Sequence, residues 1–196
     1  MHAARMMALA LAAVAIPGCN DGGTTVTSAT DQAGIAAADI PSPPPPIFAE
    51  PLTARHAFTD DIAVQVRVQP DGRPTEVVNL QDASNIAMIR FTVQPGVRFP
   101  WHSHPGLVMV TVTQGELVFV YGDDCVERPY PTGTAFVDPG FGNVHYAFNP
   151  TGGETVIVAA FLGVPPTGPL TINAAPDEAA ALDAKCGVAA AMAHAH

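Results

Sequence analysis

The chain has 196 residues, of which 48% are hydrophobic and 13% are charged, so it holds enough apolar material for one domain with a packed core. Its 8 basic and 18 acidic residues give a net charge of -10. Because the backbone of a nucleic acid binds basic surfaces, this balance excludes nucleic acid from the expected partners.

Residues 1–19 are typical of a segment that directs export. Arg5 precedes an apolar run, residues 6–16, that is too short to cross a bilayer. The run closes on Ile-Pro-Gly-Cys, residues 16–19, which resembles a bacterial lipobox except for its proline. The resemblance implies that Cys19 is lipidated and begins the mature chain of a membrane-anchored lipoprotein. The alternative is an ordinary signal peptide, which would release the protein into the periplasm or the extracellular space.

Residues 20–51 are expected to form a disordered stalk. They are rich in Gly, Thr, Ser, Ala and Pro and include the run Pro43 to Pro46. Such a composition buries too little apolar surface to offset the entropy lost on ordering, and it favours extended polyproline conformations. The stalk would hold the domain away from a membrane surface, and a Pro-rich recognition ligand is the alternative. The folded domain is predicted over residues 52–172.

Short runs of β-branched and aromatic residues fill this domain, and Gly, Pro, Asn and Asp separate them. None of the runs shows a sustained apolar period of 3.6 residues. The fold class is therefore all-β, a barrel or a sandwich. The predicted strands are residues 62–68, 75–80, 86–93, 107–113, 117–121, 134–137, 144–148 and 155–162.

The Ala-rich residues 173–196 are predicted to be a tail or a short helix. A helix over residues 177–185 would have Pro176 at its start and Gly187 past its end. The terminal His194 and His196 are expected to lie in a frayed end.

Two cysteines, Cys125 and Cys186, remain after export, and each lies beside turn-forming residues. An exported protein reaches a compartment that allows disulfides, so we expect these two residues to be bonded. The alternative is two free thiols.

Two histidines stand out among strands that are otherwise poor in polar residues. His102 and His104 are two residues apart, so in a strand their side chains point to the same face. Both imidazoles could then bind one ion at about 2.0–2.1 Å, and His145, in another predicted strand, could supply a third ligand. We expect a divalent transition metal, with iron, zinc, manganese, nickel and copper as the candidates.

The surroundings of these histidines resemble the two motifs of the cupin superfamily. In the first, five residues separate Gly96 from His102 and ten separate His104 from Gly115. The second spans residues 133–149 around His145, with one extra residue between its Pro and its Gly. The resemblance covers about residues 85–162 and implies a double-stranded β-helix barrel, and it also implies a possible homodimer formed through the sheets.

One position departs from the first motif. The motif carries a Glu seven residues before its closing Gly, and here that residue is Val108. Parity with the two histidines points Val108 into the cavity beside the metal, which it cannot bind. Glu116 and Asp138 have the wrong parity or place to supply a carboxylate. Arg98 has inward parity and could meet an anionic substrate at the cavity mouth, or it is an exposed residue at a strand end. Four aromatic residues are expected to pack away from the cavity, namely Phe99, Trp101, Phe141 and Tyr146.

Three neutral imidazoles leave a bound ion its full positive charge, which favours anionic or chelating ligands. Within the cupins, three-His iron sites are similar to those of thiol dioxygenases and diketone-cleaving dioxygenases. One hypothesis is therefore a metal-dependent oxidoreductase that acts on a small organic molecule. The others are a non-catalytic module of the cell envelope that binds or senses a small ligand, and a barrel without metal. The sequence identifies neither the substrate nor the metal.

Overall fold

The computed structural model describes residues 45–188. The predicted signal segment with Cys19, most of the predicted stalk, and the terminal His194 and His196 lie outside the described residues. Within residues 45–188, no helix has the length and apolar character needed to span a membrane.

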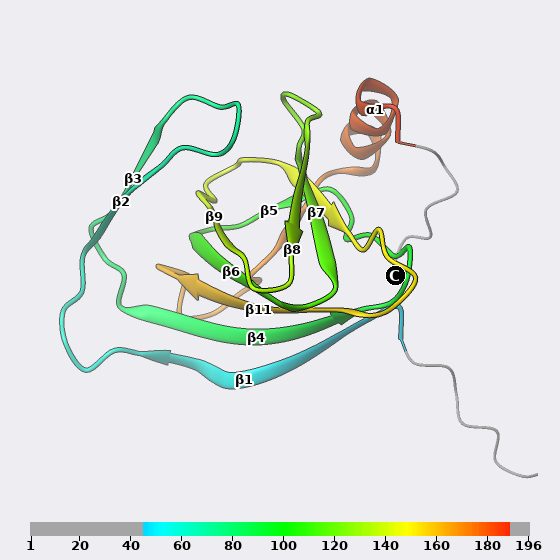
Figure 1. The fold of residues 1–196 in the computed structure, drawn as a ribbon. Helices are drawn as coiled ribbons and strands as arrows, with labels where there is room; N and C mark the ends of the chain where they lie inside the picture. Colours follow the sequence, from blue (N-terminus) through cyan, green and yellow to red (C-terminus); the bar gives the residue numbers. More distant parts are fainter. Residues whose placement is uncertain (1–44, 189–196) are drawn as a thin grey trace, which may run out of the picture. The chain divides into compact units, whose positions relative to one another are not determined.

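Two five-stranded antiparallel sheets form the body of the domain, a double-stranded β-helix, as predicted (Figure 1). The first sheet has the order β1 (Ile47–Ala57), β4 (Asn85–Val93), β11 (Thr155–Leu162), β6 (Leu107–Gln114) and β9 (Ala135–Asp138). The second has the order β12 (Ile172–Asn173), β5 (His102–Ser103), β10 (His145–Phe148), β7 (Glu116–Tyr121) and β8 (Glu127–Pro131). A separate hairpin is made by β2 (Val64–Val68) and β3 (Glu76–Leu80), and the helix α1 spans Pro176–Cys186.

The core lies between the two sheets and follows the two-residue period of the strands. Every second residue of β11 is buried, and its buried face packs with inward residues of β6 and β7. The principal members of this core are Val108, Val110, Val112, Leu117, Phe119, Ile157, Ala159 and Phe161.

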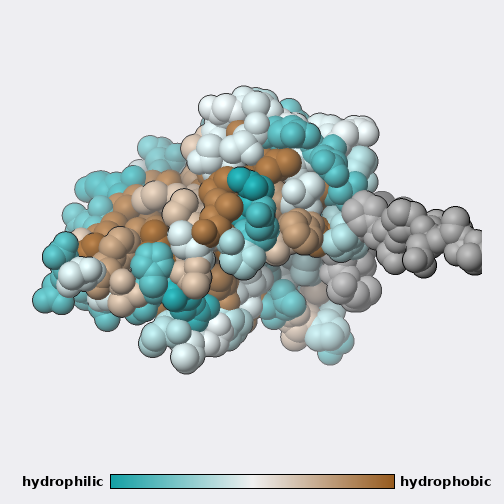
Figure 2. Space-filling model, turned by 90° about the horizontal axis from the view of Figure 1, so that it is seen from below, coloured by the Kyte–Doolittle hydropathy of each residue, from teal (hydrophilic) through white to brown (hydrophobic). Residues whose placement is uncertain are grey.

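The outer face of the first sheet is less apolar than its core face but still carries hydrophobic groups. Seen from the side of β1 and β4, hydrophobic surface alternates with hydrophilic patches (Figure 2). Phe48 of β1 and Met109 of β6 are among the exposed large hydrophobic side chains.

The first strand begins at Ile47, inside the segment predicted as a stalk, so the boundary predicted at residue 51 falls within β1. Strand β1 is an edge strand whose residues are mostly exposed, and it is held by main-chain pairing with β4 and by an ion pair of 2.9 Å between Glu50 and Arg90. An exposed edge strand needs no alternation of apolar residues, which is why its composition resembles a linker. At the other end, β12 and α1 extend the ordered domain into the predicted tail.

Helix α1 packs on the outer face of the second sheet. Leu182 and Ala179 join the cluster formed by Trp101 and Tyr146. The helix has proline in its first turn, and Gly187, directly past its end, has a φ of 65° in the left-handed region, as the sequence predicts.

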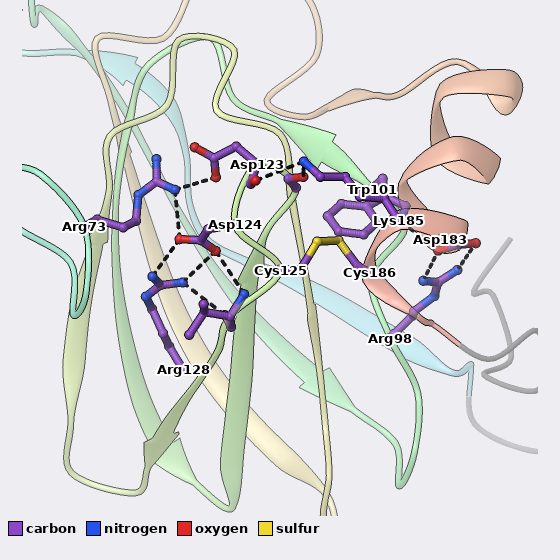
Figure 3. The surroundings of a disulfide bond; sticks show 12 residues. Arg73, Arg98, Trp101, Asp123, Asp124, Cys125, Arg128, Asp183, Lys185 and Cys186 are labelled. Carbon is purple, nitrogen blue, oxygen red and sulfur yellow. Dashed lines mark hydrogen bonds and ion pairs between the residues drawn. A yellow bond between two sulfur atoms is a disulfide. The ribbon is translucent and has the colours of Figure 1, made fainter.

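Covalent and polar contacts also fasten this helix (Figure 3). The predicted disulfide is present between Cys125 and Cys186, whose Cα atoms are 5.1 Å apart. Lys185 Nζ donates to the carbonyl of Gly122 at 2.8 Å. The C-terminal segment is thereby tied to the turn that follows β7.

Candidate metal centre

The three predicted histidines come together at one end of the second sheet. His102 lies in β5, His104 follows that strand, and His145 begins β10, directly opposite His102. All three are buried, and their candidate ligand atoms lie within 4.8 Å of one another. Two ligands of one ion at about 2.0–2.1 Å are at most about 4.2 Å apart, so a slight inward movement of the rings completes a site.

Backbone carbonyl groups hold each ring in one tautomer. Nδ1 of His102 donates to the carbonyl of Pro100 at 2.6 Å, and Nδ1 of His104 donates to that of Leu170 at 2.8 Å. Nδ1 of His145 donates to the carbonyl of Asn143 at 2.9 Å. A carbonyl oxygen only accepts, so the proton of each ring is on Nδ1 and the lone pair is on Nε2. This is the arrangement that supports metal-binding histidines in proteins.

The electrostatics of the site keep the imidazoles of His102 and His145 neutral. Burial, and then the neighbouring imidazoles, lower the pKa of His102 well below its ordinary value. The same two causes lower the pKa of His145 to about 3. At neutral pH these rings carry lone pairs that are ready to bind a cation, and binding there needs no proton release from them.

A carboxylate that the sequence pattern placed elsewhere, that of Asp138, also lies at the site. Asp138, at the end of β9, is only 1% exposed. Its Oδ2 is 3.7 Å from Nε2 of His104 and 3.8 Å from Nδ1 of His145. Burial raises the pKa of Asp138 to about 6. The expectation that Asp138 has the wrong parity or place to lie beside the histidines is therefore wrong. The parity of β9 is set by its pairing with β6, which its own sequence does not reveal.

The histidines and Asp138 open on a cavity of about 170 Å³ between the sheets. Val108 lies on its wall, as predicted, and Phe99 lines it too, contrary to expectation. Phe141 is exposed and does not line the cavity. Most of the remaining lining is apolar, with contributions from Phe91, Val110, Leu117, Phe119, Phe136, Ala147, Ile157, Ala159 and Phe161.

Arg98 does not line the cavity, so that prediction is wrong. Its guanidinium is buried against α1, where it forms bonds of 2.7 and 3.1 Å to the two oxygens of Asp183 (Figure 3). The N–H of Phe99 bonds to the carbonyl of Ala147, whereas His102 lies opposite His145. Moving three residues along the first strand, from Phe99 to His102, thus moves only two residues along its partner, from Ala147 to His145. Because of this irregularity, Arg98 and His102 point to opposite faces.

The family model of the cupin domain matches residues 89–161, which include all three histidines and Asp138. The chain contains a cupin domain. The two motifs and the double-stranded β-helix agree with this assignment. A search of curated proteins found no match.

The chain is similar to solved structures of several kinds of protein. The polyketide cyclase RemF from Streptomyces resistomycificus is 20% identical with a TM-score of 0.41, over 48% of this chain and 63% of that one. An oxalate oxidase in complex with glycolate is 30% identical with a TM-score of 0.37, over 42% and 44% of the two chains. A cupin-like protein from Thermotoga maritima is 22% identical with a TM-score of 0.39, over 50% and 72%. These TM-scores are too low for a comparison of function.

Proposed function

We propose that this cupin binds one divalent transition metal ion through Nε2 of His102, His104 and His145 and acts as a dioxygenase-like oxidoreductase on a small chelating molecule. One observation carries the proposal: three buried imidazoles, each held through Nδ1 by a backbone carbonyl on its far side, turn Nε2 toward one end of a buried cavity.

The residues fit a metal ion in kind and in number. Neutral imidazole nitrogens suit iron, zinc, nickel and copper, and three protein ligands leave coordination positions open to a substrate. When bound, such an ion supplies Lewis acidity and, if it is redox-active, one-electron chemistry.

The cavity walls indicate the kind of substrate. An apolar cavity of about 150 Å³ accommodates benzene, so the volume of about 170 Å³ seen here suits a single ring or a short branched chain. Aromatic and aliphatic side chains, including Phe91, Phe119 and Phe161, would contact the body of that molecule and exclude water. Its donor atoms would face the imidazoles, the polar end of the cavity.

The charge that attracts the substrate would come from the ion. Among the residues that line the cavity in the described part of the chain, none is Lys or Arg. The expectation that Arg98 meets an anionic substrate no longer supports the proposal. The substrate would instead be held by chelation, because a molecule with two adjacent oxygen donors can occupy two open positions of the ion.

Oxygen consumption tests this proposal. The protein loaded with Fe²⁺ would be incubated with small diketones, catechols and thiols, and His104→Ala would serve as the inactive variant. His56→Ala is the matched control, because His56 is an exposed histidine on β1, away from the cavity. Consumption of oxygen by the wild type and the control, but not by His104→Ala, supports an oxidoreductase. Metal-dependent ligand binding without consumption would instead identify the non-catalytic binding module.

We also propose that the protein is exported and tethered through Cys19, which lies outside the described residues. The lipobox-like sequence supports this proposal, and so does the Cys125–Cys186 disulfide, because disulfides persist in oxidising compartments outside the cytoplasm.

A further inference from the structure

We propose that Asp138 is a fourth metal ligand, a carboxylate that replaces, from the adjacent strand, the glutamate that the first motif lacks at Val108. This inference rests on the proposed metal site and specifies its ligand set and its charge.

The register of the first sheet places the substitute carboxylate beside the missing one. Val108 of β6 and Asp138 of β9 are directly opposite each other in the antiparallel ladder. Opposite residues project to the same face of a sheet, with Cβ atoms about 4.5–5.5 Å apart. Both side chains accordingly line the same cavity. A carboxylate on β9 can therefore reach the region that a Glu on β6 would occupy.

The two oxygens of Asp138 have different surroundings. Oδ1 accepts a hydrogen bond of 3.1 Å from the N–H of Gly140 and so helps to fix the turn after β9. Oδ2 is buried and has no hydrogen-bond partner. Oδ1 thus stabilises the turn, whereas Oδ2 faces the histidines. A buried polar atom without a partner is costly, and each such atom calls for an explanation.

A cation between Asp138 and His104 explains the contact. Nδ1 of His104 donates to the carbonyl of Leu170, so in the neutral ring Nε2 carries a lone pair, and without a cation two electron-pair donors would face each other across 3.7 Å. Two ligands bound to one ion at about 2.0–2.2 Å are separated by no more than about 4.4 Å, and the observed distance fits that limit.

The charges lead to the same conclusion. Among the described residues, the basic side chains within 4 Å of the Asp138 carboxylate are those of His104 and His145, and neither Lys nor Arg balances its charge. A divalent cation held by three neutral imidazoles and one carboxylate would carry a net charge of one unit in place of two. Buried carboxylates are tolerated where they are paired or coordinate a metal.

The experiment compares the affinities of the full chain for Zn²⁺ and for Mn²⁺, measured by competition with a chromophoric chelator. Asp138→Asn keeps the side-chain volume and can still accept the bond from Gly140. We expect it to weaken Zn²⁺ binding by more than about 100-fold, beyond the usual effect of losing a group that merely orients a ligand. Mn²⁺ binding should weaken further, because Mn²⁺ favours oxygen ligands. Adding Val108→Glu to Asp138→Asn should recover affinity, and Glu116→Gln, which removes a carboxylate at the start of β7, is the control without effect.

A second measurement does not depend on the folding of a variant. In wild-type protein with 13C-labelled aspartate, the carboxyl resonance of Asp138 should shift on addition of Zn²⁺. If the wild type binds neither ion, the proposed metal site fails and this inference fails with it. If the wild type binds Zn²⁺ but the Asp138 resonance stays in place, or if Asp138→Asn retains the affinity for both ions, Asp138 is not a ligand while the three-His site stands.

Discussion

Removal of the Cys125–Cys186 disulfide should destabilise the protein and leave its metal site almost intact. The bond joins residues 61 positions apart, and in the chain-entropy model closing a loop of that length contributes about 4 kcal/mol to the free energy of unfolding. The loss arises in the unfolded chain, which gains the conformations that the cross-link forbids.

The native state has other contacts that keep α1 in place. Oδ1 of Asp183 accepts one hydrogen bond of 2.7 Å from the guanidinium of Arg98 and another of 2.7 Å from the indole N–H of Trp101. In the segment before the helix, β12 pairs with β5, and the carbonyl of Leu170 accepts a hydrogen bond from the ring of His104. These contacts do not involve the disulfide. We therefore expect Zn²⁺ affinity to change by less than about tenfold in the Cys125→Ser, Cys186→Ser double variant, well below the effect of removing a ligand.

Urea unfolding of the metal-free double variant and of the metal-free wild type measures the loss in the free energy of unfolding. Chelator competition measures the change in Zn²⁺ affinity. Lys185→Ala is a control that removes two hydrogen bonds from α1 and leaves the cross-link intact. A loss of less than about 1 kcal/mol would refute the loop-closure reasoning. A collapse of Zn²⁺ affinity would refute the claim that the non-covalent contacts suffice to position β5 and β12.

Three further predictions concern the anchor, the cavity wall and pH. Cys19→Ser should release the protein from the membrane fraction or stop its processing, and unchanged processing and fractionation of the variant would show that Cys19 is not a lipid anchor. Val108→Glu should lower the melting temperature of metal-free protein, because it buries a second carboxylate opposite Asp138, and Zn²⁺ should restore it; a variant that Zn²⁺ does not stabilise contradicts the metal site. In the presence of chelator, the free energy of unfolding should fall from about pH 6.5 to about pH 3, because His102 and His145, whose pKa values are lowered in the folded state, bind protons first in the unfolded state. Each histidine costs about 1.4 kcal/mol per pH unit. Asp138, whose pKa burial raises to about 6 from an ordinary value of 3.8, offsets the loss from one histidine between those two pH values. A flat pH profile in urea unfolding contradicts buried neutral imidazoles.

The features that the sequence predicted are those that local pattern determines. Strands such as β6 and β11 alternate buried and less buried residues, and this period is visible in the chain itself. His102 and His104 share a face because they are two residues apart. The disulfide and the helix boundaries followed from the paired cysteines and from Pro176 and Gly187.

The features that it missed are set by neighbours in space. Strands β5 and β12 have two residues each and exist only through their pairing with each other and with β10. Arg98 was misplaced because the ladder slips by one residue before His102. Asp138 was dismissed because no residue of β9 signals which face meets the cavity, and only its pairing with Val108 decides that.

The metal content of protein purified from its native host, without chelator, tests the central claim most directly. We predict about one equivalent of a transition metal per chain by mass spectrometry, retained in His56→Ala and lost in His104→Ala. A wild-type protein with less than about a tenth of an equivalent, and with no uptake of added Zn²⁺ or Fe²⁺, would contradict the three-His metal centre.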